Sequence, residues 1–286
     1  MSIQGGIRYE IAGVDKNIVK GSPIFRSGLN IQAAKATFIR ASWGQGFRIP
    51  TIGEKYVTSE FLQGLLVVPN DTLKPEKGWN LEVGIKQGFE FNKWKAYADA
   101  AFFYQQYDNF IEMQVGIYDN RYSNGNQIFS QSLEFPFAGT GKVLGLRGTN
   151  VVRARIAGYE IGFRSNGPIG PVGLQLYAGY TYTWPGQDPK DAEGKSTYSI
   201  DNFFRDMFKY TYKNVTDSIT LDRLLYYRLR HMLKADIELD VWHCYFGFSA
   251  NVGSMPEKIP PLFKLASNVL FGDINAIEKY LNDRKK

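Results

Sequence analysis

The chain has 286 residues, a net charge of +6 and 44% hydrophobic residues, values typical of a folded protein and not of a disordered one. Aromatic residues make up 15% and 29 residues are glycine, a combination that favours strands over helices. The single cysteine, Cys244, excludes an internal disulfide and a paired-cysteine metal site, and two histidines leave little for zinc or haem. Carboxylate oxygens remain available, but we expect no metal site and no cofactor.

Targeting signals are absent from the start of the chain. Residues 1–10 lack a basic segment followed by an apolar one, so they are not a signal peptide. No stretch reaches the roughly 18 apolar residues of a transmembrane helix. These observations alone would describe a cytosolic soluble protein, and the patterns below argue against that interpretation. The positive charge permits an anionic partner, and no pattern indicates nucleic acid.

Apolar and polar residues alternate with a period of two in nine segments, which predicts nine strands. In the clearest segment, Leu81, Val83 and Ile85 alternate with Glu82 and Gly84. The nine segments are residues 3–11, 25–31, 39–44, 79–86, 96–105, 157–164, 174–184, 233–240 and 245–252. Each predicted strand therefore has one apolar and one polar face.

The connections between these segments alternate between short and long. The short ones are residues 32–35, 91–95, 167–171 and 241–243, and the long ones are residues 46–77, 107–151 and 184–225. Short turns at one end and long loops at the other are typical of an outer-membrane β-barrel. Aromatic residues near strand ends resemble the girdles at bilayer interfaces. They are Tyr180, Tyr182, Trp184, Trp94, Trp242 and Tyr245. A soluble sheet that packs its apolar face on a core is the alternative.

Four motifs carry a resemblance to a known family. Residues 36–51 (ATFIRASWGQGFRIPT) contain Arg40, Gly44, Gly46, Phe47, Arg48 and Pro50. Residues 70–87 (NDTLKPEKGWNLEVGIKQ) contain Leu73, Lys74, Pro75 and Glu76. Both segments resemble signature motifs of TonB-dependent outer-membrane receptors, in which the first is a strand that runs into an outer loop. Residues 97–112 and 150–162 resemble two further motifs, and all four occur in the order and spacing of the family.

The resemblance covers residues 1–255 and implies an all-β fold. We expect an antiparallel meander of about nine long strands that forms an open part of a barrel of about 22 strands, a size class with a plugged lumen. Residues 256–286 would form an outer loop of the same domain with a short helix, since Ile274, Ile277, Tyr280 and Leu281 have helical spacing. No segment resembles the plug or the energy-coupling box of the family. We therefore expect a truncated product, a gene fragment or a partial sequence.

The resemblance also implies a location in the cell outer membrane and a role in uptake, not catalysis. Such receptors take up a scarce large nutrient, such as a ferric siderophore, cobalamin or a glycan. The expected partners are the lipid bilayer, the nutrient, and the TonB complex acting through a plug domain. The alternatives are a non-transporting β-sheet module that binds glycan, a passive outer-membrane channel, and a barrel protease or lipase, which the shortage of histidine disfavours.

The motif residues suggest structural roles. Gly44 and Gly46 would allow a bend where the strand leaves the sheet, and Pro50 and Pro75 would mark loops. Lys74 and Glu76 would serve loop packing or a surface ion pair, which is worth little when exposed.

Three arginines are the candidate ligand-binding residues. Arg147, Arg153 and Arg155 could attract an anionic ligand at the loop mouth, and the alternative is a solvated strand extension. Elsewhere, three acidic residues on one strand face are expected to pair with a base such as Lys234 or with an absent partner domain, and a cation site is the alternative; these are Asp236, Glu238 and Asp240.

Overall fold

The structure is a computed structural model that describes residues 1–14, 17–62, 65–119, 142–188, 199–210, 224–225, 228–242 and 244–254. The chain divides into two compact units. The first unit comprises Met1–Phe47, Lys77–Asp108 and Val152–Glu257, and the second comprises Arg48–Glu76, Asn109–Val151 and Lys258–Lys286. The predicted C-terminal helix lies outside the described residues, and the predicted domain limits at residues 255 and 256 stay a prediction.

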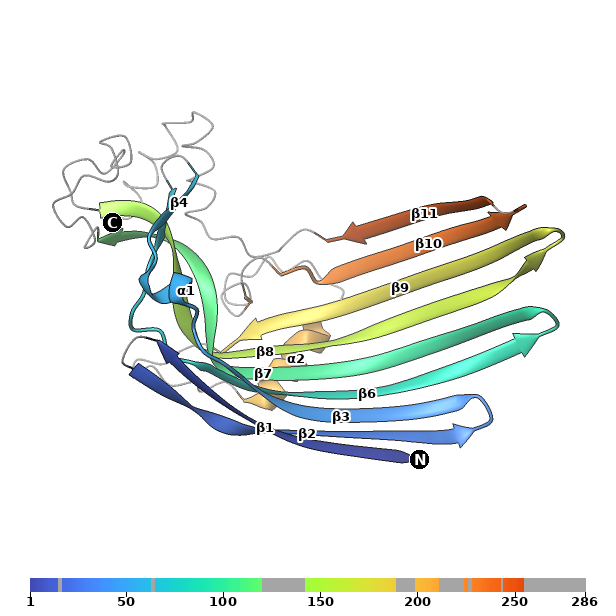
Figure 1. Ribbon diagram of the computed structural model, residues 1–286, viewed down its shortest axis with the longest axis horizontal. Coiled ribbons are helices and arrows are strands. Elements are labelled where there is room, and N and C mark those ends of the chain that lie inside the picture. The colour runs from blue at the N-terminus through green and yellow to red at the C-terminus, as the bar shows by residue number, and fades with distance from the viewer. Residues whose placement is uncertain are drawn as a thin grey trace. The chain divides into compact units, whose positions relative to one another are not determined.

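Nine long strands follow one another as neighbours in chain order, which confirms the predicted antiparallel meander (Figure 1). They are β1 (Ser2–Val14), β2 (Asn17–Ala34), β3 (Thr37–Arg48), β6 (Glu76–Phe91), β7 (Trp94–Asp119), β8 (Lys142–Ile169), β9 (Val172–Gln187), β10 (His231–Val241) and β11 (Cys244–Gly253). Strands β7 and β8 each contribute to both units. Among the described residues no pairing joins β1 to β11, so the sheet is open.

The register of the first unit separates two faces. Residues directly opposite each other in an antiparallel pair share a face. Leu81 lies opposite Tyr104, and its neighbour Glu82 lies opposite Phe103. We call the face that carries Leu81 and Tyr104 the apolar face, and the face that carries Glu82 the polar face. The exposed residues of the apolar face are Leu81, Val83, Ile85, Phe89, Ile161, Phe163, Leu233, Ile237, Leu239, Phe246, Phe248 and Val252. The polar face carries Arg40, Glu82, Lys86, Asp99, Glu160, Arg164, Lys234 and Asp236.

Four tight turns join the strands at one end of the first unit (Figure 1). They connect β2 to β3, β6 to β7, β8 to β9 and β10 to β11, as the four short connections predicted. Three turn residues have a positive φ: Asn92 at 55°, Gly170 at 61° and Trp242 at 45°. Glycine and asparagine adopt this left-handed conformation readily, which explains why the chain reverses at the first two positions.

The long connections contain more regular structure than the sequence predicts. Residues 107–119 and 142–151, expected as loop, belong to β7 and β8. Polar residues such as Gln106 and Asp108 interrupt the apolar pattern there and hide the continuation. The second unit also holds the helix α1 (Ile52–Tyr56) and the strands β4 (Ser59–Leu62) and β5 (Leu65–Val68). Strand β5 pairs with β4 and, in parallel, with β8 at Val67 and Leu146.

A second helix, α2 (Ile200–Tyr210), falls in the predicted loop 184–225 and packs on the apolar face of the first unit (Figure 1). Phe203 and Met207 are 1% and 2% exposed. They join a core cluster with Tyr104, Ala157, Tyr182, Trp184 and Leu224. Ring centroids of Phe203 and Tyr104 lie 6.0 Å apart in an edge-to-face arrangement. The aromatic residues at this end of the strands are therefore covered by a helix and not exposed.

No helix in the described part of the chain is both long and apolar enough to cross a membrane.

Truncation of the buried ring of α2 tests this packing. We expect Phe203→Ala to destabilise the first unit by about 3 kcal/mol, because large-to-small changes in a core lose contacts and leave a cavity. Urea unfolding measures the change, and amide exchange in α2 should rise first. The matched control is Arg205→Ala on the same helix, whose exposed side chain bonds, among the described residues, to Asn202 in α2 itself. Equal stability of the two variants would contradict the packing.

Candidate functional site

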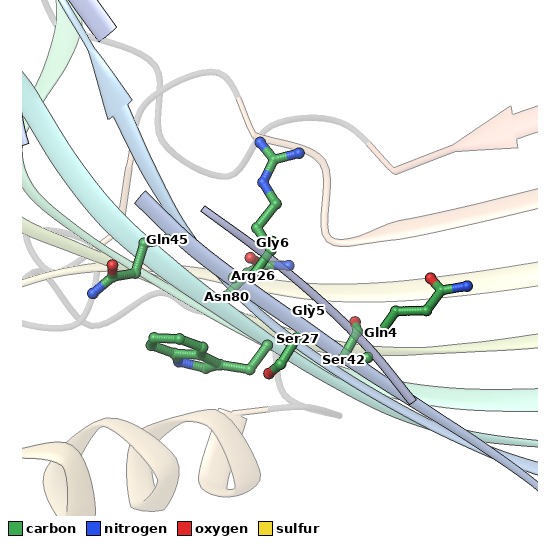
Figure 2. A pocket seen from close by; sticks show the side chains of 11 residues that line it. Gln4, Gly5, Gly6, Arg26, Ser27, Ser42, Gln45 and Asn80 are labelled. Atoms are coloured by element: carbon green, nitrogen blue, oxygen red, sulfur yellow. The ribbon is translucent and has the colours of Figure 1, made fainter. Parts of the chain in front are cut away.

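An open groove of about 550 Å³ lies over β1, β2 and β3 of the first unit (Figure 2). It is lined by Gln4, Gly5, Gly6, Arg26, Ser27, Gly28, Ser42, Trp43, Gly44, Gln45 and Asn80. Arg26 stands opposite Gly6 on one side and Gly44 on the other, so its long side chain has two glycines as strand neighbours. Figure 2 shows Arg26 extending away from the strands. The groove therefore presents one guanidinium above a surface of backbone.

Glycines form the floor of this groove. A methyl group at Gly6 or Gly28 would meet nothing within 4 Å, and at Gly44 it would lie 3.1 Å from Asn80 Oδ1. The absence of side chains lets another molecule or segment approach the strand backbone closely. The sequence predicts that the strand leaves the sheet at Gly44 and Gly46. Both glycines instead lie inside β3, which continues to Arg48.

The motif residue Arg40 belongs to a charged row on the polar face. Its Nε donates to Glu82 Oε1 at 3.1 Å, and its Nη2 lies 4.0 Å from Asp99 Oδ2. Gly84 makes room for this guanidinium, since a methyl group there would lie 3.1 Å from Arg40 Nε. Because these side chains are about one-third to two-fifths exposed, the ion pairs contribute little stability. Toward the other end of β3, Lys77 Nζ lies 6.0 Å from the ring centre of the motif residue Phe47.

In the second unit, one ion pair joins the two signature motifs. Arg48 Nε and Nη2 donate to the two carboxylate oxygens of Glu76 at 2.7 and 3.0 Å, a two-pronged contact. The Glu76 side chain is only 9% exposed and also accepts the backbone N–H of Ile111. The hydrogen bond from Arg48 to Glu76 raises the pKa of the arginine. Glu76 is thus an almost buried partner, and not a purely superficial one.

The other motif residues of the second unit support this loop. Leu73 is 3% exposed and Pro50 is buried, whereas Lys74 is exposed. The backbone N–H and C=O of Lys74 both bond to the side chain of Asn150, at 2.9 and 3.0 Å. Pro75 directly precedes β6, and Pro50 follows β3, as the expectation that both prolines mark loops requires.

Helix α1 is capped by residues that the sequence reasoning overlooked. Thr51 accepts the N–H of Glu54, and Glu54 accepts the N–H of Thr51 at 2.7 Å, which forms a capping box. Arg48 Nη1 also donates to Glu54 at 3.1 Å. Partial burial opposes ionisation of Glu54, but the hydrogen bonds from Thr51 and Arg48 and the arginine charge outweigh it and lower the pKa.

Two of the three candidate ligand arginines are held by carboxylates. Arg153 Nε lies 2.7 Å from Asp108 Oδ1, and Arg155 Nη1 lies 3.0 Å from Asp188 Oδ1. Arg155 is 4% exposed and stands opposite Gly186, in line with the residues of the apolar face. Neither aspartate is predictable from the sequence as a partner, because the paired residues are far apart along the chain and only the fold brings them together.

The third arginine makes its contacts in the second unit. Arg147 Nη2 donates to Asn70 Oδ1 at 3.2 Å, and its guanidinium lies 5.5 Å from the ring centre of Tyr118. Its Nε is buried and has no hydrogen-bond partner among the described residues. The contacts of Arg147 are thus separate from those of Arg153 and Arg155, which all lie in the first unit. Of the three arginines, Arg147 is the one with a buried Nε that has no hydrogen-bond partner among the described residues.

The described residues contain no group of three or more histidine, cysteine, aspartate or glutamate side chains that could hold a metal ion. Cys244 is exposed, and His231 Nδ1 lies 2.7 Å from the hydroxyl of Tyr180. Lys234 Nζ lies 3.4 Å from Asp236, the pairing expected for that acidic strand face. His243 lies outside the described residues.

A family model of the TonB-dependent receptor-like β-barrel matches residues 1–252. The chain therefore belongs to the family of TonB-dependent receptor β-barrels, which are outer-membrane proteins. In such a barrel the apolar face meets lipid and the polar face lines the lumen. Arg26, Gly6 and Gly44 share the polar face with Arg40 and are accordingly lumenal, whereas Ser27 and Trp43 of the groove lining lie on the other face. A search of curated protein sequences finds no match.

Several solved structures are similar to the chain. One is the siderophore receptor PirA from Pseudomonas aeruginosa, with a TM-score of 0.44, 14% identity, and coverage of 81% of this chain and 33% of that one. Another is a double mutant of the Serratia marcescens hemophore receptor HasR in complex with its hemophore HasA and heme (0.47, 12%, 88% and 39%). A third is the copper transporter OprC (0.44, 16%, 83% and 27%). The chain spans 27% to 39% of the length of these three proteins.

Removal of the arginine that joins the two motifs should loosen the second unit. We expect Arg48→Ala to cost about 2 kcal/mol, below the value for a fully buried pair, because Glu76 loses its partner while Arg48 itself is partly exposed. Amide exchange over residues 48–76 measures the effect. Arg48→Lys should recover only part of the loss, since an ammonium cannot make the two-pronged contact. Unchanged exchange protection of these residues in Arg48→Ala would contradict the role of this pair.

Acid should open helix α1. Because the folded-state pKa of Glu54 is lowered, its contribution is present above the unfolded-state pKa and is lost as the pH falls through the folded-state pKa. We therefore expect the exchange protection of the amides of residues 53–56 to decrease once the pH falls below about 4.3, the usual pKa of glutamate. Glu54→Gln should show weak protection at every pH. An unchanged acid profile in that variant would show that another group controls the helix.

Proposed function

We propose that this chain forms part of the wall of an outer-membrane receptor that takes up a scarce large nutrient, such as a ferric siderophore or cobalamin, with energy from the TonB complex. The match of the receptor-barrel family to residues 1–252 carries the proposal. In this proposal, residues 1–255 belong to the barrel and residues 256–286 form an outer loop of the same domain. The TonB complex acts through a plug domain in contact with the lumen.

The groove over β1–β3 is suited to such a role. Its floor is backbone at Gly6 and Gly28, and Arg26 and Gln4 supply hydrogen-bond donors beside it. A plug segment or a passing substrate can lie close to the strands there, because few side chains stand in the way. In the neighbouring part of the lumenal wall, the charge of Arg40 is offset by Glu82 and Asp99.

Among the three candidate arginines, we propose that Arg147 contacts the nutrient directly, in preference to Arg153 and Arg155. All three were candidates from the sequence, but Arg153 and Arg155 are paired with Asp108 and Asp188. Arg147 has a buried Nε without a described partner, and an unused buried donor is costly unless something bonds to it. An anionic or carbonyl-bearing nutrient, or a part of the protein itself, supplies such an acceptor.

Uptake in cells tests the proposed function. The gene is deleted from its host, and accumulation of radiolabelled ferric siderophores and cobalamin is compared with and without the protein, each in strains with intact and inactivated TonB. We expect that one of these compounds is taken up only when both the protein and an intact TonB are present. Uptake that persists without TonB, together with a stable open conductance in planar bilayers, would indicate the passive channel. Binding of glycan without any uptake would indicate the binding module.

The arginine assignment makes a separate prediction. We expect Arg147→Ala to weaken nutrient binding about tenfold, because hydrogen bonds to charged groups contribute about 1.5–3 kcal/mol. The measurement is the concentration of nutrient at half-maximal binding to whole cells. The matched control is Arg153→Ala, which should leave this concentration unchanged and lower the stability of the first unit instead. The reverse pattern would overturn the choice of Arg147.

A further inference from the structure

Helix α2 has a wider apolar stripe than its seat on the sheet covers. Ile200, Phe203, Phe204 and Met207 share one side of the helix, at the spacing of one helical face. Phe203 and Met207 are buried against the sheet. Phe204 is only half-buried, and Ile200 is 43% exposed. The exposed Arg205 lies off this stripe. An apolar edge of the helix is thus left uncovered on the outside of the sheet.

The height of α2 along the strands follows from the strand lengths. An apolar band of about 25 Å, crossed by strands tilted by about 40°, needs about ten residues of strand. The residues that lie ten positions from the tight-turn ends of β6, β8, β9 and β10 are, in that order, Leu81, Tyr159, Tyr182 and His231.

Three of these positions, on β8, β9 and β10, lie side by side, and the fourth is next to Tyr104 on β7. Tyr159 is opposite Tyr182, which is opposite His231, and Leu81 is opposite Tyr104. Tyr104, Tyr159, Tyr182 and His231 thus form one level of aromatic and imidazole rings on the apolar face, as expected at the far interface of the bilayer. Below this level, toward the tight turns, the apolar face exposes large aliphatic and aromatic side chains.

Helix α2 packs at this same level. The ring of Tyr104 lies 6.0 Å from that of Phe203 and 5.5 Å from that of Phe204, and Phe102, one step nearer the turns, lies 6.3 Å from Phe204. Within the first unit, the helix packs against Tyr104 and Ala157 on the apolar face, and Arg40 and Glu82 lie on the other face. A helix on the lipid side of the wall at the interface level meets lipid on its uncovered edge.

We propose that α2 is an interfacial helix: it lies on the outer wall of the barrel at the boundary between acyl chains and headgroups of the outer leaflet, with Ile200 in contact with lipid. Amphipathic helices of this kind bury their apolar side about 5–10 Å into the boundary region. The aromatic level of the strands supplies the seat, and the bilayer covers the rest of the stripe. The proposal rests on the membrane location of the family and not on any substrate.

Depth-dependent quenching tests the proposal. The full-length protein is prepared with Cys244→Ser and Ile200→Cys. The cysteine at position 200 is labelled with a bimane fluorophore, and the protein is reconstituted in vesicles of phosphatidylcholine and phosphatidylglycerol. We expect lipid with a nitroxide near the top of its acyl chain to quench position 200 strongly, and aqueous iodide to quench it weakly. The matched control is Asn202→Cys, about 200° away around the helix, which should show the opposite pattern.

Two results would overturn the proposal. One is strong iodide quenching at position 200 without quenching by the nitroxide lipid, which would mean that this edge faces water. The other is excimer emission from pyrene at position 200 that disappears when labelled protein is diluted with unlabelled protein, which would mean that a second copy covers α2. Both substitutions are at incompletely buried positions, so folding should be retained, and Ile200→Asp gives a second readout by lowering stability in vesicles but not in detergent.

The uptake assay separates this proposal from the proposed function. If uptake depends on TonB and position 200 faces water, only the placement of α2 is wrong. If position 200 is quenched by lipid and no uptake is found, the interfacial helix stands and the transport function fails.

Discussion

In a bilayer, every backbone N–H and C=O of a spanning strand has to be bonded to a neighbouring strand, because the hydrocarbon offers no other partner. The long ladders of the first unit meet this requirement, and the rest of its structure depends on them. The ladder from Lys77 opposite Asp108 to Phe91 opposite Trp94 runs without a register shift. A fixed register puts Leu81 and Glu82 on opposite faces, so lipid-facing and lumenal residues are separated by the backbone alone.

The second unit depends on a different interaction. There the chain leaves the regular ladder, and Arg48 and Glu76, which are 28 residues apart, hold the two motifs together. Glu76 also takes the N–H of Ile111, so one nearly buried carboxylate ties three segments of the chain. A capping box and a short parallel pairing of β5 with β8 add to it. Such a loop is built on a few polar contacts and not on a large core, which makes it sensitive to single substitutions.

The sequence predicted the strands well because lipid imposes a strict alternation, and weakly where that constraint ends. Beyond Gln105 the pattern of β7 is broken by polar residues, since the strand there no longer faces acyl chains alone. Asp108 and Asp188 could not be foreseen as the partners of Arg153 and Arg155, because only register and the path of the chain after β9 bring them close. Helix α2 had a visible signal in the spacing of Ile200, Phe203, Phe204 and Met207, and the long polar loop around it obscured that signal.

By itself, the sequence determined the antiparallel meander, the positions of the tight turns and, through its motifs, the receptor family, because period-two patterning and turn residues are local properties. The tertiary structure decided which charges are paired, which arginine keeps an unused donor, and where α2 rests. Those features depend on residues that are distant along the chain and become neighbours only when the strands are in register. The groove beside Arg26 is of the same kind: its glycines are unremarkable singly, and form a floor only when β1, β2 and β3 lie side by side.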